Sequence, residues 1–190
     1  MGTRGAVGFY VGGKTKVGYN HWDSYPGGLG AEVVKWLQGK ADPISMYEKA
    51  RMLAPVPDRE PTAEEIERLK PWTNLSVSNQ STSDWYCLLR ETQGSLEATL
   101  ESGFYSDAES FLADSLFCEW AFIINLDDEV FEVYKGFQKA LHTAGRYSSI
   151  PVQEKGSGNT YYPVALVASF PLTAIPEDWT SQVDPPEEDE

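Results

Sequence analysis

The chain has 190 residues, of which 41% are hydrophobic and 13% aromatic, and it carries a formal net charge of −14 at pH 7. These values are typical of a single globular domain. A membrane-spanning helix is not expected, because no apolar run approaches the roughly 18 residues that such a helix requires. The acidity also argues against general nucleic-acid binding, because contacts to phosphate need Lys and Arg side chains.

Residues 4–11 and 15–20 predict a β-hairpin at the start of the chain. Gly12 and Gly13 lie between the two runs. They are natural turn residues, because glycine adopts the positive φ angles that tight hairpin turns require. The first two strands should therefore be neighbours in a sheet.

The register of this hairpin depends on the length of its turn. A two-residue turn places Phe9 opposite Lys16, whereas a three-residue turn from Gly12 to Lys14 places Phe9 opposite Val17. We expect the three-residue turn, because it gives one clean apolar face and a shift of one residue would invert that face. The opposite face would then be polar, with room for a ligand, and would carry Arg4, Ala6, Gly8, Gly18 and Asn20.

A block of helices is expected after the hairpin. Residues 31–38 present their aliphatic side chains on one side, as a helix would. A second helix should run from an N-cap at Asp42 to about Leu53, with proline at its first position. Thr62 and Glu65 form a capping box, which predicts the start of a third.

Further helix signals follow in the middle of the chain. Residues 84–92 and 96–101 predict two short helices, each followed by a glycine. Ser106 and Glu109 make a second capping box, which predicts another helix start.

Strands return in the last third of the chain, at residues 118–126, 130–135 and 161–170. Helices gathered in the middle, rather than alternating with strands, favour an α+β fold. We predict a single α+β domain over residues 1–175, with an antiparallel sheet of about five strands and the helices packed mainly against one face. Residues 176–190 are expected to form an acidic, disordered tail.

Cys87 and Cys118 are isolated and have hydrophobic neighbours. This context predicts two buried thiols rather than a disulfide or a zinc site. Nothing at the start of the chain is typical of a secretory signal. We therefore expect a cytoplasmic protein with no metal, no cofactor and no membrane partner.

The segment from Tyr19 to Gly30 is the strongest candidate for a chemical site. If strand geometry continued through it, His21 and Asp23 would share one side, so that Asp23 could orient the imidazole as a general base. The candidate catalytic residues are His21, Asp23 and Ser24. The alternative, given equal weight, is that these side chains satisfy backbone groups where the hairpin leaves the sheet.

A small anionic ligand could bind at the glycine-rich end of the same segment. Free N–H groups at a helix start can hold an anion, and an aromatic side chain could stack on a planar group. The alternative is a tight turn with Gly30 at the N-cap. The candidate ligand-binding residues are Arg4, Asn20, Trp22, Tyr25, Gly28 and Gly30.

Five segments together carry a resemblance to a known family. They are Gly2-Thr3-Arg4-Gly5, Tyr19-Asn20-His21-Trp22-Asp23-Ser24-Tyr25-Pro26-x-Gly28-Leu29-Gly30, Trp85-Tyr86-x-Leu88-Leu89-Arg90-x-Thr92-Gln93-Gly94, Phe131-Glu132-Val133-Tyr134-Lys135-Gly136 and Tyr161-Tyr162-Pro163-Val164. On these segments the chain resembles an uncharacterised family of small proteins associated with tailed bacteriophages, especially of actinobacterial hosts, and with some bacterial and fungal genomes. The resemblance omits the acidic tail and implies no particular reaction.

Two functions of different classes remain open. The first is a bacteriophage accessory protein that binds a host protein in the host cytoplasm and has no chemistry of its own, with its acidic surface steering it to a basic partner. The second is a protein that binds or hydrolyses a small anionic ligand or nucleotide at Arg4 and residues 20–30. We favour the first, because nothing in the sequence completes a catalytic set.

Overall fold

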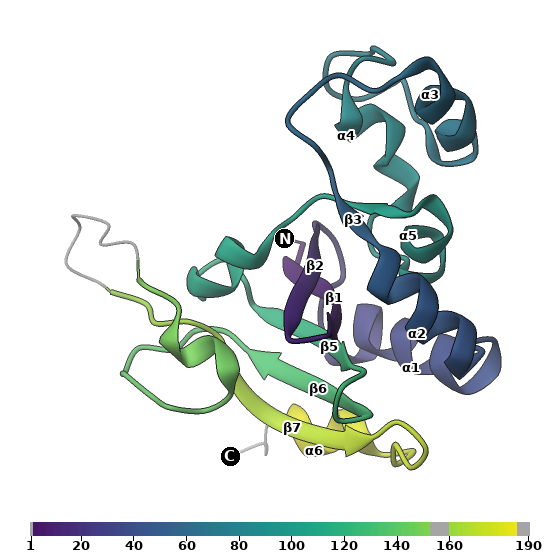
Figure 1. The fold of residues 1–190 in the computed structure, drawn as a ribbon. Helices are drawn as coiled ribbons and strands as arrows, with labels where there is room; N and C mark the ends of the chain where they lie inside the picture. Colours follow the sequence, from purple (N-terminus) through teal and green to yellow (C-terminus); the bar gives the residue numbers. More distant parts are fainter. Residues whose placement is uncertain (1, 153–159, 186–190) are drawn as a thin grey trace.

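The computed structural model describes residues 2–152 and 160–185. Its centre is a five-stranded sheet in the order β2-β1-β5-β6-β7 with helices beside it (Figure 1), so the α+β class is confirmed. The sheet strands are β1 (Gly5–Val11), β2 (Lys14–Asn20), β5 (Trp120–Asn125), β6 (Val130–Lys135) and β7 (Ala165–Pro171), and a separate pair is formed by β3 (Ala54–Pro55) and β4 (Phe104–Tyr105). The α-helices are α1 (Ala31–Gly39), α2 (Pro43–Met52), α3 (Ala63–Leu69), α4 (Trp85–Leu88), α5 (Leu96–Ser102) and α6 (Trp179–Val183). Within the described residues, none of these helices is both long and apolar enough to cross a membrane.

The sheet is mixed, so the prediction of an antiparallel sheet is wrong. Strands β1 and β5 run parallel, with Gly5 beside Trp120 and Tyr10 beside Asn125. The other three pairs are antiparallel. A parallel pair needs a long crossover, and the helical block between the β1–β2 and β5–β6 hairpins provides it.

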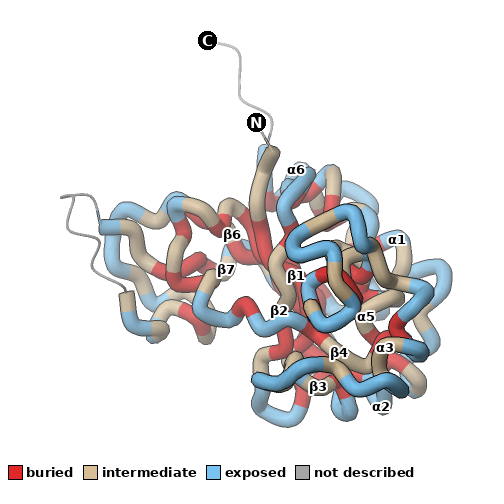
Figure 2. The backbone as a smooth tube through the Cα atoms, turned by 90° about the horizontal axis from the view of Figure 1, so that it is seen from above, coloured by how far each residue is buried: buried red, intermediate tan, exposed pale blue. Residues whose placement is uncertain are grey.

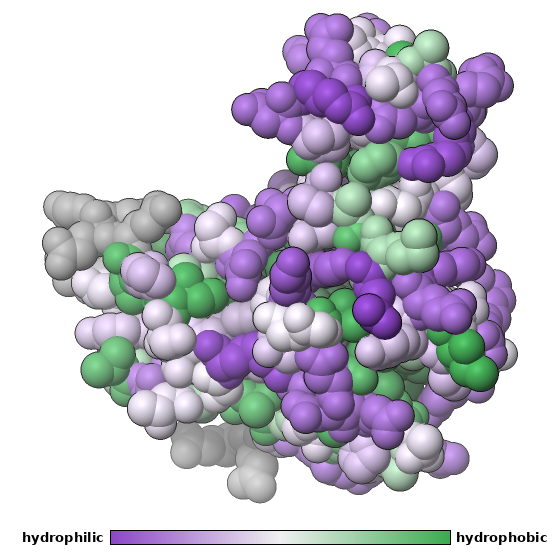
Figure 3. Space-filling view, viewed as in Figure 1, coloured by the Kyte–Doolittle hydropathy of each residue, from purple (hydrophilic) through white to green (hydrophobic). Residues whose placement is uncertain are grey.

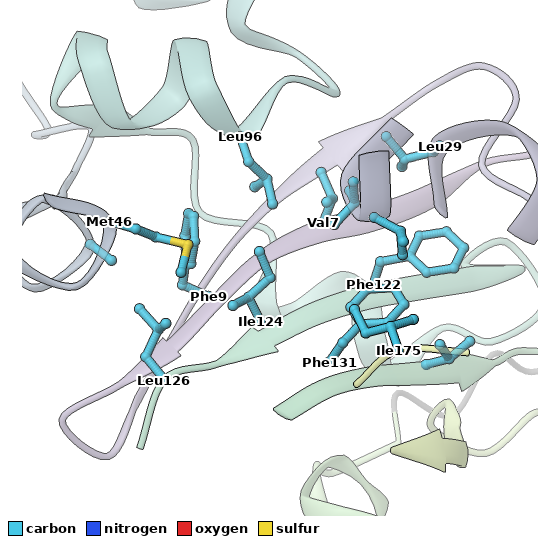
Figure 4. Packing of buried hydrophobic residues seen from close by; sticks show 14 of the residues in the cluster. Val7, Phe9, Leu29, Met46, Leu96, Phe122, Ile124, Leu126, Phe131 and Ile175 are labelled. Atoms are coloured by element: carbon cyan, nitrogen blue, oxygen red, sulfur yellow. The ribbon is translucent and has the colours of Figure 1, made fainter. Parts of the chain in front are cut away.

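Hydrophobic side chains cover both faces of the sheet. On one face, Val7 and Phe9 of β1 pack in a large cluster with residues of β5, β6, α1, α2, α5 and α6 (Figure 4). On the other face, Ala6 and Val17 pack with Leu112 and other residues of a smaller cluster. Buried backbone accordingly runs through the centre of the molecule (Figure 2).

The first hairpin has a two-residue turn, so the expected three-residue turn is wrong. Gly12 and Gly13 both have positive φ, at 59° and 72°, as a tight hairpin turn of this kind requires. Phe9 lies opposite Lys16, and Asn20 therefore lies on the face of Phe9 rather than on that of Ala6. The argument from one apolar face failed because both faces of this hairpin are covered.

Lys16 can occupy a buried position because its charge is fully partnered. Its Nζ donates hydrogen bonds to the carbonyl oxygens of Ala50, Arg51 and Leu53, at 2.8 to 2.9 Å. These carbonyls are at the C-terminus of α2, where the helix dipole favours a cation. Lys16 thereby fixes α2 against the edge strand β2.

The helix starts follow local capping chemistry in most places. Asp42 accepts a hydrogen bond from the Ser45 N–H, and Thr62 with Glu65 forms the complete capping box before α3. The box expected at residues 106–109 does not form. There, Asp107 accepts from the Glu109 N–H, and a 3₁₀ turn, η4 (Glu109–Ala113), follows.

The expected helix over residues 84–92 is two short pieces, α4 and the 3₁₀ turn η3 (Arg90–Thr92). Leu69, Trp85, Leu88 and Leu89 form a third hydrophobic cluster under α3 and α4. This part of the chain stands apart from the sheet in Figure 1, and its surface is mostly hydrophilic in Figure 3.

The folded part of the chain extends beyond residue 175. Helix α6 lies within the segment expected to be a tail, and Trp179 is buried with its ring edge-on to Phe122 and Phe131. A bulky aromatic residue in an acidic, proline-rich sequence therefore marks a packed helix here. Residues 186–190 lie outside the described part of the structure.

Candidate functional site

The segment that follows β2 turns away from the sheet and then enters α1 through the turn η1 (Pro26–Gly30), which is kinked at Gly28, where the backbone is not helical. Asp23 has a positive φ of 52°, a conformation that Asp tolerates better than most residues. Strand geometry therefore ends before Asp23, so the premise that His21 and Asp23 share one side does not hold.

Asn20 and Ser24 form a buried clasp inside this segment. The Asn20 side-chain amide donates to the Ser24 Oγ at 2.8 Å and also to the Trp22 carbonyl oxygen. The Ser24 N–H donates to the Thr3 carbonyl oxygen at 3.1 Å. Ser24 is fully buried, so its hydroxyl is used in packing and a substrate has no access to it.

His21 is held by the aromatic residues on either side of it, Tyr19 and Trp22. Its Nδ1 lies 2.6 Å from the Tyr19 hydroxyl, and its ring is edge-on to Trp22, with 4.3 Å between the ring centroids. The Arg4 guanidinium lies 4.4 Å above the centre of the Phe117 ring. Of the three groups proposed to converge, those of Arg4, His21 and Asp23, only Asp23 lines the groove described below.

The fold requires glycine at positions 28 and 30 of η1. A Cβ on Gly28 would collide with the Asp23 carbonyl oxygen, and one on Gly30 would lie 2.7 Å from both Phe122 and Trp179. The N–H groups of Gly28 and Gly30 donate to the Tyr25 carbonyl oxygen, and that of Leu29 donates to Asp23. These amides are therefore not free to hold an anion.

A groove of about 800 Å³, which we call the aromatic groove, nevertheless opens beside this segment. Three segments line it. They contribute Asn20, Trp22, Asp23, Tyr25 and residues 27–29 from the turn, Glu32, Val33, Lys35, Trp36, Gly39 and Lys40 from α1 and its end, and residues 93–97 from the start of α5. Of the candidate ligand-binding residues, Asn20, Trp22, Tyr25 and Gly28 line this groove, whereas Arg4 and Gly30 do not.

The walls of the groove combine exposed aromatic rings with charges of both signs. Trp22 is 58% exposed and Tyr25 is 43% exposed. Lys40 lies 4.0 Å from Glu97, and both side chains are largely in solvent. With Lys35, Glu32 and Asp23 also in the lining, the groove has no dominant charge.

The far wall of the groove could not be found from sequence. Residues 93–97 are distant along the chain. Gly94 was expected only as the stop of the helix over residues 84–92, and Leu96 only as the start of the next helix. Gly94 has a φ of 79°, and a Cβ there would lie 2.7 Å from the Asn20 Oδ1. The one local signal was therefore the glycine itself, which allows the α5 side to approach β2 closely.

Within residues 2–152 and 160–185, no three His, Cys, Asp or Glu side chains are grouped to hold a metal ion. Both cysteines are buried and free, and burial raises the pKa of the Cys118 thiol, which leaves it unreactive at neutral pH.

No family model, curated protein or solved structure matches the chain.

Proposed function

We propose that this protein acts by binding another protein through the aromatic groove and catalyses no reaction. The observation that carries the proposal is the fixed display of Trp22 and Tyr25. Both rings are strongly exposed, yet they stand on a turn whose backbone and side chains are held by internal hydrogen bonds. Aromatic side chains held rigidly at the surface are typical anchors of protein interfaces.

The identity of the partner is a further part of the proposal. The resemblance to a phage protein family supports a host protein, met in the cytoplasm of the host cell. The net charge of −14 supports a basic partner, because a strongly acidic protein attracts positive surfaces over a distance of about a Debye length.

A pull-down with the full chain from an actinobacterial lysate tests this proposal. We expect one protein to be retained in equal amounts by the wild type and by Phe137→Ala, and to be lost with the Trp22→Ala/Tyr25→Ala double variant. Phe137 is 48% exposed and does not line the groove, so it controls for the loss of any exposed aromatic ring. Equal retention by all three forms would overturn the proposal.

A small ligand is the second candidate, and the size of the groove favours it. A volume of about 800 Å³ is within the range of roughly 300–1,000 Å³ that small-molecule sites occupy. An anionic ligand or nucleotide would meet Lys35 and Lys40 rather than Arg4. A nucleotide that raises the melting temperature of the wild type, and not that of Lys35→Gln/Lys40→Gln, would support this candidate instead.

A further inference from the structure

A second hollow lies beside the edge strand β2 and shares only Gln93 and Gly94 with the lining of the aromatic groove. It has a volume of about 240 Å³ and lies between β2, the segment of residues 86–94 and the segment of residues 105–108. The Ala108 N–H donates to the Val17 carbonyl oxygen at 2.9 Å. That bond holds the last segment against the edge of the sheet and closes one side of the hollow.

Gly18, which lines the hollow, faces open space. A Cβ on Gly18 would meet only the Ser106 carbonyl oxygen, at 3.9 Å. Gly8 in the partner strand is different, because a Cβ there would collide with the backbone of Lys16 and Val17. Packing therefore requires glycine at position 8 and leaves open space at position 18.

Arg90 brings an uncompensated positive charge to the wall of this hollow. Its Nη1 donates to the Gln93 Oε1 at 2.7 Å. Among the described residues, no carboxylate is within ion-pair distance of the guanidinium. Since arginine has five N–H donors, most of those of Arg90 remain available to a ligand. Lys16 also lines the hollow, but its ammonium is used by the three carbonyl oxygens at the end of α2.

Asp107 contributes a negative charge from the other segment. Its Oδ1 accepts the Glu109 N–H at 3.0 Å. Tyr86 and Tyr105 also line the hollow, and in the described part of the chain no protein group is hydrogen-bonded to either hydroxyl. Burial and the nearby Asp107 and Glu109 raise the pKa of Tyr105, so its hydroxyl is protonated and able to donate.

We propose that this hollow binds a small zwitterion of amino-acid size, with its carboxylate on Arg90 and its ammonium on Asp107. One free guanidinium and one carboxylate from two different segments match the two charges of such a molecule. The volume is smaller than that of a typical drug-sized site. The tyrosine rings supply the apolar contact that a short side chain needs.

Isothermal titration of the full chain with the free L-amino acids tests this proposal. We expect at least one of them to bind, and its N-acetyl and carboxamide forms to bind at least about tenfold more weakly, because each lacks one charge. Absence of binding by every free amino acid at millimolar concentration would overturn the proposal, as would equal binding of the blocked forms.

Two variants locate the binding in the hollow. Gly18→Val should fill the space, and Arg90→Gln should remove the charge, so each should weaken binding at least about tenfold. Arg51→Gln is the matched control, because Arg51 is exposed and does not line the hollow. If the melting curve shows that Gly18→Val is unfolded, the proposal is tested by Arg90→Gln alone. Binding to Arg90→Gln with wild-type affinity would overturn the proposal.

Discussion

The side-chain amide of Asn20 donates a hydrogen bond to the Ser24 hydroxyl at 2.8 Å, and both residues are buried. This bond joins the last residue of β2 to the turn that leads into α1. It explains why a segment rich in polar side chains is packed like a core element. The segment carries Trp22 and Tyr25, and its polar groups form the internal hydrogen bonds that hold it in place.

Removal of the Asn20 amide should destabilise the fold. Asn20→Ala leaves the Ser24 hydroxyl and the Trp22 carbonyl without their donor, and an unpaired buried polar group costs about 1–3 kcal/mol. Urea denaturation should show a lower free energy of unfolding by about that amount. Asn79→Ala, at an exposed position, should change the free energy of unfolding by less than about 0.5 kcal/mol. An equal effect of the two variants would show that the Asn20 hydrogen bonds do not stabilise the fold.

The buried position of Lys16 makes a second prediction. Lys16→Met keeps most of the apolar stem of the side chain but leaves three carbonyl oxygens at the end of α2 without a charged donor. We therefore expect a loss of about 2–4 kcal/mol in the free energy of unfolding. Lys14→Met, two residues earlier and exposed, is the control. A loss no larger than that of the control would show that the three hydrogen bonds contribute nothing.

An ion pair between the buried Glu132 and the partly buried Arg146 joins β6 to the 3₁₀ turn η5 (Arg146–Ser149). The Arg146 guanidinium binds both carboxylate oxygens of Glu132, which also accept from Asn125 and Tyr134. Arg146→Met should cost about 3–5 kcal/mol, because it leaves a buried carboxylate without its cation. Chemical denaturation measures the effect.

Two further variants test that pair. Adding Glu132→Gln to Arg146→Met should recover part of the lost stability, because the uncompensated charge is gone. Lys70→Met breaks an exposed pair with Glu67 and should cost less than about 1 kcal/mol. Similar losses for Lys70→Met and Arg146→Met would contradict the assignment of a buried pair.

The capping box at α3 predicts a dependence of stability on pH. Hydrogen bonds from Arg59 and from the Thr62 N–H lower the pKa of Glu65 to about 2. A carboxylate with a depressed pKa in the folded state stabilises the fold above its ordinary pKa, and this contribution is lost as the pH falls through the depressed value. Glu65→Gln should therefore lower the melting temperature at pH 7, and the difference from wild type should shrink between about pH 4.5 and pH 2.

The neighbouring Glu64 provides the control for that measurement. It lies in the same first turn of α3 and is exposed, and its side chain takes no part in the capping box. Glu64→Gln should show little difference from wild type at either pH. A constant difference between Glu65→Gln and wild type across this pH range would show that the ionised carboxylate is not what stabilises the helix start.

Elements governed by local chemistry could be predicted from the sequence. The start of α2 at Asp42 and that of α3 at Thr62 depend on bonds between residues three apart, so the sequence carries the whole signal. The β5–β6 hairpin was also expected, because its strands alternate and its loop is acidic and short. These features need no knowledge of the distant chain.

Elements governed by distant partners could not be predicted. The register of the first hairpin depends on the carbonyls of α2 that hold Lys16, and the burial of Trp179 depends on Phe122 and Phe131. Residues of the segment from Asn20 to Leu29 line the aromatic groove, but the far wall of that groove comes from residues 93–97. Local sequence patterns identify the aromatic residues of the groove, but they do not show that residues 93–97 lie opposite them.

The affinity of the retained partner for the three forms of the protein tests the central claim most directly. With the purified partner, we predict that Trp22→Ala/Tyr25→Ala weakens binding by at least about 30-fold, as expected when anchors worth about 2 kcal/mol are removed, and that Phe137→Ala binds like the wild type. Equal dissociation constants for the wild type and the double variant would contradict the assignment of the aromatic groove as the binding surface.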